Sequence, residues 1–167
     1  MKEWLCFPAA MMLLASCTGQ NGETAKTPDQ QAKELMTQVV SCFENGDKAG
    51  LKQLFSEHVI QTDEELDGAL DSAFALIDGK ITSYDPPFGS AMGSHEQKAC
   101  GGETFHVLTE KGTSYNIAYT GWLTYDSDPS YIGIKGLRVV NATKNEQIPP
   151  AERRTVDPDV CILVGEF

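Results

Sequence analysis

Residues 113–125, TSYNIAYTGWLTY, alternate between bulky apolar side chains and smaller polar ones along most of their length. Successive side chains of a β-strand point to opposite faces, so this spacing predicts an antiparallel strand with one buried face. The positions expected to face the core are Tyr115, Ile117, Tyr119, Leu123 and Tyr125. The polar positions fall on the other face, together with Trp122.

Further β-prone segments lie on both sides of this strand. The predicted strands are residues 80–84, 103–110, 113–125, 130–141 and 159–164. Lys111-Gly112 and residues 126–129 supply the turns that join the three central strands. Residues 85–102 are rich in glycine and show no periodicity, which predicts a long loop, and residues 142–158 are expected to form a second loop.

The N-terminal half has a helical period instead. Thr27 can act as the N-cap of a helix, Pro28 suits its first turn, and Gln30 completes a capping box. Gly46 is typical of the residue that ends such a helix. The apolar stripe of this first helix consists of Ala32, Leu35, Met36, Val39, Val40 and Phe43.

Two more helices are expected before the strands begin. Asp47 can cap a short helix over residues 48–55. Thr62 and Glu65 have the spacing of a second capping box, which predicts a third helix over residues 63–78. Three helices followed by a run of antiparallel strands predict the α+β class, with the N-terminal helices packed on one face of the sheet.

The composition excludes one large class of partners. The 167 residues include 13 Lys and Arg against 24 Asp and Glu, which gives a net charge of −11. Because a nucleic-acid-binding protein needs a basic face to neutralise phosphates, we expect no nucleic-acid partner. An apolar fraction of 41% is ordinary for a folded globular domain.

The first residues indicate export. Residues 4–15 are almost all apolar, but the run is too short to span a bilayer and fits the apolar region of a signal peptide. The sequence Leu14-Ala15-Ser16-Cys17 that follows resembles a bacterial lipobox, in which the cysteine thiol receives a diacylglycerol before cleavage. An unlipidated signal peptide or a buried helix is the alternative interpretation.

This pattern divides the chain into three parts. Residues 1–16 are the predicted lipoprotein signal peptide, residues 17–27 the lipidated Cys17 with a flexible polar tether, and residues 28–167 a single domain. The predicted location is therefore the extracytoplasmic face of the cell membrane, with the membrane itself a partner through Cys17. The acidic charge either keeps the domain off anionic headgroups or serves solubility in general.

Three cysteines remain in the mature chain. Cys42, Cys100 and Cys161 allow at most one disulfide, and the sequence does not choose among the three pairs. Cys42 and Cys161 as small buried side chains are the alternative. Cysteine and histidine lack zinc spacing, and no nucleotide or cofactor motif occurs, so we expect no metal and no cofactor.

Several segments resemble known families. Residues 45–51 and 54–56 look like the junction of the first two helices in nuclear-transport-factor-2-like (cystatin-like) domains. Residues 74–85, FALIDGKITSYD, are similar to the signature of a family of short bacterial lipoproteins, the domain of unknown function 5104. Residues 109–115 and 129–139 match its strand pattern. The resemblance implies a curved antiparallel sheet wrapped against three helices as a cone with an open mouth, and it implies no activity.

A cone suggests a concave ligand pocket. The strand alternation nominates Tyr115, Tyr119 and Tyr125 for its wall, with Tyr84 approaching from the neighbouring strand. The alternative is that these rings fill the core beneath the helices, since tyrosine is ordinary on the buried face of a strand.

Enzymes of the resembled superfamily use a carboxylate or a His–Asp pair inside the cone, so His106, Asp78 and His58 are the candidates here. If Phe105 and Val107 face the core, His106 faces solvent. Asp78 falls at the end of a helix, where a carboxylate is usually solvated, and His58 is expected to pack or cap. We therefore assign no catalytic residue.

These observations lead to one main functional hypothesis and two alternatives. The main hypothesis is a membrane-anchored module that binds a small molecule or a protein at the cell surface. The alternative is a small enzyme of the isomerase or dehydratase type that uses the cone pocket. A purely structural envelope lipoprotein is the third possibility, and it predicts no pocket.

Overall fold

Helices precede strands in the computed structural model, which describes residues 26–85, 89–95, 98–147 and 161–165. The helices are α1 (Pro28–Asn45), α2 (Lys48–Gln53), α3 (Glu57–Thr62), α4 (Leu66–Leu76) and α5 (Ala142–Gln147). The strands are β1 (Ile81–Tyr84), β2 (Gly89–His95), β3 (Lys98–Thr109), β4 (Ser114–Tyr125), β5 (Gly133–Asn141) and β6 (Cys161–Gly165). The predicted α+β class is confirmed.

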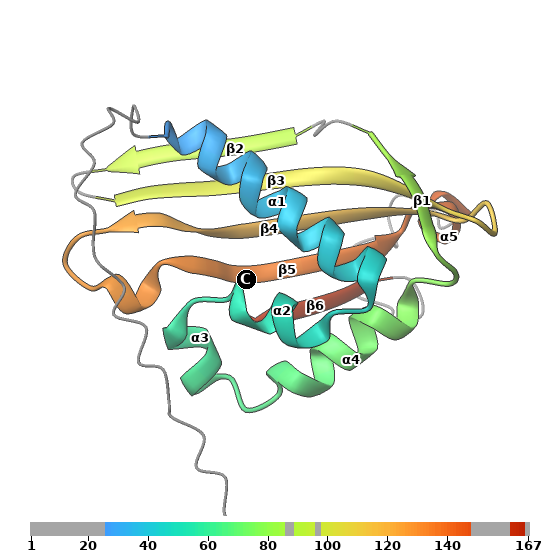
Figure 1. Ribbon diagram of the computed structural model, residues 1–167, viewed down its shortest axis with the longest axis horizontal. Coiled ribbons are helices and arrows are strands. Elements are labelled where there is room, and N and C mark those ends of the chain that lie inside the picture. The colour runs from blue at the N-terminus through green and yellow to red at the C-terminus, as the bar shows by residue number, and fades with distance from the viewer. Residues whose placement is uncertain (1–25, 86–88, 96–97, 148–160, 166–167) are drawn as a thin grey trace, which may run out of the picture.

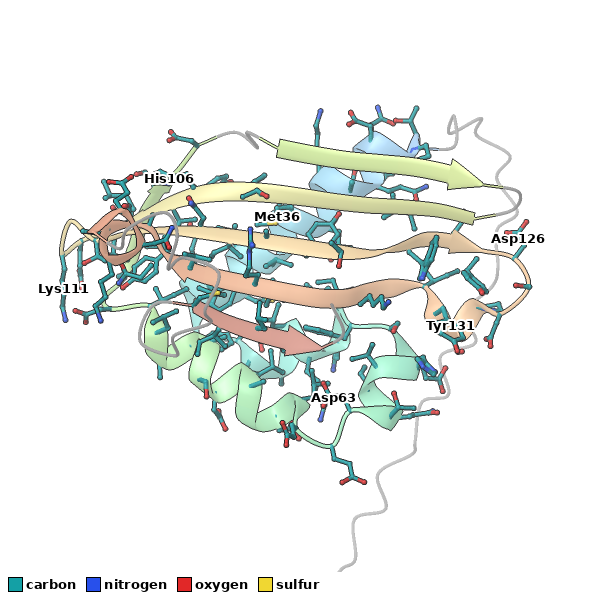
Figure 2. All side chains as sticks on the ribbon, turned by 180° about the vertical axis from the view of Figure 1, so that it is seen from behind. Met36, Asp63, His106, Lys111, Asp126 and Tyr131 are labelled. Carbon is teal, nitrogen blue, oxygen red and sulfur yellow. The ribbon has the colours of Figure 1, made fainter. Side chains whose placement is uncertain are left out.

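The strands form one antiparallel sheet in the order β1-β3-β4-β5-β6. The long strand β3 pairs with β2 through its first half and with β1 through its second half. Helices α1 to α4 all lie on one face of this sheet (Figure 1). Seen from behind (Figure 2), the described part of the opposite face carries no helix across it, and α5 lies at one end. The expected packing of helices on a single face is confirmed.

Helix α1 begins and ends where the sequence indicates. Thr27 Oγ1 accepts a hydrogen bond from the Gln30 backbone N–H at 3.3 Å, and Gln30 Oε1 accepts one from Thr27 N–H at 3.0 Å. Gly46 follows the helix at φ 65°, a left-handed conformation in which glycine carries no steric cost. The buried residues of α1 are Ala32, Met36, Val39, Val40 and Phe43.

The second capping box was wrong. Ser56 instead starts the separate helix α3, because its Oγ accepts a hydrogen bond from Val59 N–H at 3.3 Å. Thr62 donates its hydroxyl proton to the His58 carbonyl at 2.7 Å and so caps nothing. The chain then turns, and α4 begins without a side-chain cap. The helix predicted over residues 63–78 is therefore the shorter helix α4, and α3 before it was not predicted.

The predicted loop over residues 85–102 was also wrong. The segment forms β2 and the start of β3, an antiparallel hairpin whose register runs from Gly89 opposite Thr104 to His95 opposite Lys98. Because its side chains are small and it contains several glycines, the segment shows no alternation of apolar and polar residues. Its strands are therefore recognised only from their pairing with the distant strand β4. Residues 142–147 of the second predicted loop form α5, and the rest of that loop lies outside the described residues.

The core lies between the sheet and the four N-terminal helices. Tyr115, Ile117 and Tyr119 of β4 are buried as the alternation predicted. The register between β4 and β5 shifts at Thr120, and beyond it the β4 side chains, Tyr125 included, are only half-buried. The helices complete the core with residues such as Met36, Leu51, Val59, Leu66 and Leu70.

A short backbone junction joins the helices to the sheet. Ser56 N–H donates to the Ile134 carbonyl at 2.9 Å, and Ile134 N–H donates to the Leu54 carbonyl at 2.9 Å. Gly133, at φ 127°, leaves no space for a side chain because an added Cβ would lie 2.8 Å from Ser56 N. This contact fixes the α2–α3 connection against the start of β5.

Some sequence-based expectations lie outside the described residues. These include the signal peptide, Cys17 and most of the tether. Cys42 and Cys161 are both free thiols, and the side chain of Cys100 is not among those described. Within the described ranges no helix is long and apolar enough to cross a membrane.

Candidate functional site

A cavity of about 650 Å³ lies at the end of the sheet that is marked by α5 in Figure 1 and by Lys111 in Figure 2. Its wall comes from five elements or their ends. Helix α4 and the residues after it contribute Ser72, Leu76 and Asp78. The start of β4 contributes Tyr115, the end of β5 contributes Asn141, and the remaining wall comes from α5 and β6. A volume between roughly 300 and 1,000 Å³ is usual for a small-molecule site.

Tyr115 and Asn141 form the inner wall of this cavity. They are direct partners in the β4–β5 register and are 0% and 4% exposed. The Tyr115 hydroxyl accepts a hydrogen bond from Asp78 N–H at 2.9 Å. Asn141 Oδ1 accepts one from Lys144 N–H at 2.9 Å, which holds the first turn of α5. The sheet and the helix ends thereby fix both side chains.

The rim of the cavity carries charge. The Asp78 carboxylate pairs with the Lys111 ammonium, and the two side chains are 61% and 56% exposed. The hydrogen bond from Lys111 to Asp78 raises the pKa of the Lys111 ammonium. Helix α5 is fastened nearby, because Thr143 Oγ1 accepts a hydrogen bond from Ser114 N–H at 3.1 Å. The exposed Asp78 carboxylate is thus already paired with the Lys111 ammonium.

A second hollow of about 590 Å³ continues from the first along α4 and β6. Ser72 and Ile162 line both. Cys161 lies in the wall of the second hollow, and burial raises the pKa of its thiol while Arg138 acts in the opposite direction. A raised pKa keeps a thiol protonated and a poor nucleophile. Burial thus disfavours the reactive thiolate form of Cys161.

The four tyrosines nominated from the sequence occupy different places. Only Tyr115 lines the large cavity. Tyr119 is buried beneath α1, where its hydroxyl donates to the Ala32 carbonyl at 2.8 Å. Tyr84 is 43% exposed and borders a separate hollow of about 180 Å³. Tyr125 lies at the other end of β4, so the described structure does not bring these rings together.

Sequence reasoning missed Asn141, the other residue of the inner wall. Its position follows Leu137 and Val139 at intervals of two, so it shares their buried face in β5. The signal in the sequence that could have identified Asn141 is a polar residue at the next position of a buried alternation. Buried amides need hydrogen-bond partners, which makes such a position informative.

The acid and base candidates lie where packing explains them. His106 is half-buried on the face opposite Phe105 and Val107, and its Nδ1 lies 2.9 Å from Asn116 Oδ1. His58 stacks on Tyr131 with ring centroids 4.2 Å apart, which confirms that it packs. The side chain of His95 is not among those described. Neither described histidine lines the large cavity.

The opposite end of the sheet is filled with rings. Tyr131 stacks on Tyr125 at 5.2 Å, and Tyr125 meets Trp122 edge-on at 5.4 Å, which extends the stack from His58. Next to this cluster, hydrogen bonds from the Ser130 hydroxyl and N–H lower the pKa of the Asp128 carboxyl. Across the described part of the chain, no three potential metal ligands cluster together.

Comparison with known proteins places the chain in a family. Among curated proteins, none matches it. The family model of a domain of unknown function, DUF5104, matches residues 38–142. The match covers more than half of the chain and includes Tyr115 and Asn141, whereas β6 lies beyond it. This protein is therefore a member of the DUF5104 family.

Proposed function

We propose that this protein is a lipid-anchored, extracytoplasmic binding module. It holds a small molecule in the cavity between α4, the start of β4 and the end of β5. The observation that carries the proposal is a cavity of about 650 Å³ whose inner wall is made of fixed, buried polar side chains. Ligand sites combine an apolar wall with a few such groups that orient the ligand. Ala75, Leu76 and Ile162 supply the apolar part.

The chemistry of the cavity supports binding over proton transfer. Asp78 is the single carboxylate among its described lining residues, and it is exposed and paired with Lys111. A general base must reach the proton that it removes, and an exposed carboxylate engaged by an ammonium is poorly suited to that role. The isomerase or dehydratase alternative therefore gains no support from these residues and stays a prediction.

The anchoring part of the proposal rests on the sequence. The apolar run at residues 4–15 and the lipobox-like Leu14-Ala15-Ser16-Cys17 support removal of residues 1–16 and lipidation of Cys17. A polar tether of ten residues has a root-mean-square span of roughly 16–19 Å, so the domain would stay close to the membrane. We also propose that the domain has the nuclear-transport-factor-2-like cone fold. The packing of the N-terminal helices on one face of an antiparallel sheet supports this proposal.

The anchor is tested by Cys17→Ala in the full chain, produced in a bacterial host with labelled palmitate. The wild type should be cleaved, labelled and recovered with membranes. The variant should accumulate as an unlabelled precursor. Cys42→Ala is the matched control and should label like the wild type. Persistent labelling of Cys17→Ala would contradict the lipid anchor.

The binding function is tested on the same membrane-derived protein. Native mass spectrometry of the wild type, released gently from detergent, should show an added mass besides the lipid. Ala75→Trp places a large ring at the cavity wall and should remove that mass. An added mass that persists in Ala75→Trp would place the ligand elsewhere and contradict the proposed site.

A further inference from the structure

Two hydrogen-bond donors on the inner wall of the cavity have no acceptor among the described residues. The Tyr115 hydroxyl accepts from Asp78 N–H, but its own proton is donated to no described group. The Asn141 carboxamide uses its oxygen for Lys144 N–H, which leaves the amide N–H donors without a described acceptor. Both side chains are at least nine-tenths buried.

Leaving such donors buried is costly. An unsatisfied buried polar group costs on the order of 1–3 kcal/mol, so native structures pair nearly all such groups with protein or with ordered water. Both donors line a cavity that is large enough for more than a water molecule. We therefore expect a ligand that brings acceptor oxygens to this wall.

The two donors are also neighbours. Tyr115 and Asn141 are direct cross-strand partners on β4 and β5, and the side chains of such a pair rise from the same face. Two adjacent donors match a group with two acceptor oxygens, and charged acceptors form stronger hydrogen bonds than neutral ones. Lys144 is among the residues that line the same cavity, whereas Asp78, the single carboxylate among the described lining residues, is engaged by Lys111.

The structure assigns to this cavity a small organic acid whose carboxylate is held between the Tyr115 hydroxyl and the Asn141 amide. The inference rests on the proposed function, because it names the class of ligand for the same cavity. Ala75, Leu76 and Ile162 provide the apolar surface for the body of the acid. A ligand that offers only donors, such as an amine, would leave the Tyr115 hydroxyl proton and the Asn141 amide protons without an acceptor.

The test uses three probes of similar size, 4-fluorobenzoate, 4-fluorobenzyl alcohol and 4-fluorobenzylamine. Their binding to the full processed protein in detergent micelles is followed by fluorine NMR. The wild type should bind the acid more tightly than the alcohol and should bind the amine weakest. Micelles without protein correct for partitioning of each probe.

Asn141→Asp sharpens the test. Aspartate keeps an oxygen to accept the Lys144 N–H, so α5 stays capped, but it replaces the two amide donors by a second acceptor. The acid should bind about tenfold more weakly or worse, which is the loss expected for a hydrogen bond to a charged group. Asn116→Asp is the matched control, because its amide lies against His106, which is not among the lining residues of the cavity.

The outcomes separate this inference from the function on which it rests. If the alcohol or amine binds the wild type as tightly as the acid, the cavity holds small molecules without preference for a carboxylate, and only this inference falls. If the acid binds Asn141→Asp as tightly as Asn116→Asp, the inference also falls. If no probe binds the wild type at up to about 10 mM, both the inference and the small-molecule function are contradicted. If Asn141→Asp does not fold, Tyr115→Phe takes its place, because it removes one donor without changing the charge. It should then bind the acid more weakly than the wild type, and unchanged binding would contradict the inference.

Discussion

The two ends of the sheet are built differently (Figure 2). At the end marked by Tyr131, the rings of His58, Tyr131 and Tyr125 stack in series, and Trp122 meets Tyr125 edge-on. At the end marked by Lys111, the elements diverge around a cavity of about 650 Å³. The first end fills its space with its own side chains, and the second leaves space open.

This difference separates stability from binding. Aromatic pairs contribute roughly 0.5–1.5 kcal/mol beyond the area they bury, so the ring-filled end stabilises the fold. The cavity end instead keeps two buried donors without a described acceptor, which stabilises nothing until a ligand arrives. Substitutions at the two ends should therefore change different measurements.

The largest expected loss of stability is at the junction beside the ring-filled end. Gly133→Ala should lower the free energy of unfolding by about 2–4 kcal/mol, because alanine is strained at φ 127° and its Cβ would approach Ser56 N at 2.8 Å. Urea denaturation measures the change. Gly68→Ala is the matched control, since nothing lies within 4 Å of an added Cβ on that helical residue. The control should gain about 0.5–1 kcal/mol.

The next largest loss of stability is expected for Tyr131→Ala. The variant removes ring contacts with both His58 and Tyr125, and we expect a loss of about 1–3 kcal/mol in the free energy of unfolding. The dissociation constant of 4-fluorobenzoate should stay within about twofold of the wild type, because Tyr131 lies at the far end of the sheet. A tenfold change in that dissociation constant would contradict the claim that the ring-filled end affects stability and not binding.

The smallest effect is expected at the cavity rim. Asp78→Asn removes the ion pair with Lys111, and exposed pairs contribute little to stability. The pairing raises the pKa of Lys111 above its ordinary value of 10.5, so its contribution is present below pH 10.5 and is lost as the pH rises through the raised value. The small stability difference between wild type and Asp78→Asn should therefore disappear in strongly alkaline urea titrations. A difference that grows there would contradict this assignment.

Local signals in the sequence were sufficient for the elements that depend on local chemistry. The Thr27–Gln30 capping box and Gly46 fix the ends of α1 through hydrogen bonds within a few residues. The alternation in residues 113–125 likewise placed Tyr115 and Tyr119 on the buried face. Such features need no knowledge of the rest of the fold.

Features that depend on distant contacts could not be predicted in the same way. The small residues of β2 and early β3 become strands by pairing, and β3 pairs with β4 from Lys98 to Leu108. The cavity needs β4, β5, α4, α5 and β6 to end near one another, which no spacing in the sequence reveals. The three tyrosines that look equivalent by alternation, Tyr115, Tyr119 and Tyr125, consequently have three different surroundings.

Tyr115 and Tyr119 offer the most direct test of the account. They lie two residues apart on β4, both are buried, and each loses one hydroxyl on replacement by phenylalanine. The Tyr119 hydroxyl donates to the Ala32 carbonyl, whereas the Tyr115 hydroxyl lines the cavity with its proton free of a described acceptor. Each replacement should cost about 1 kcal/mol of stability.

The deciding measurement is the dissociation constant of 4-fluorobenzoate for the two variants. Tyr115→Phe should bind the acid several-fold more weakly than the wild type, and Tyr119→Phe should bind it with unchanged affinity. Equal dissociation constants for the two variants would contradict the claim that the Tyr115–Asn141 wall is a binding site.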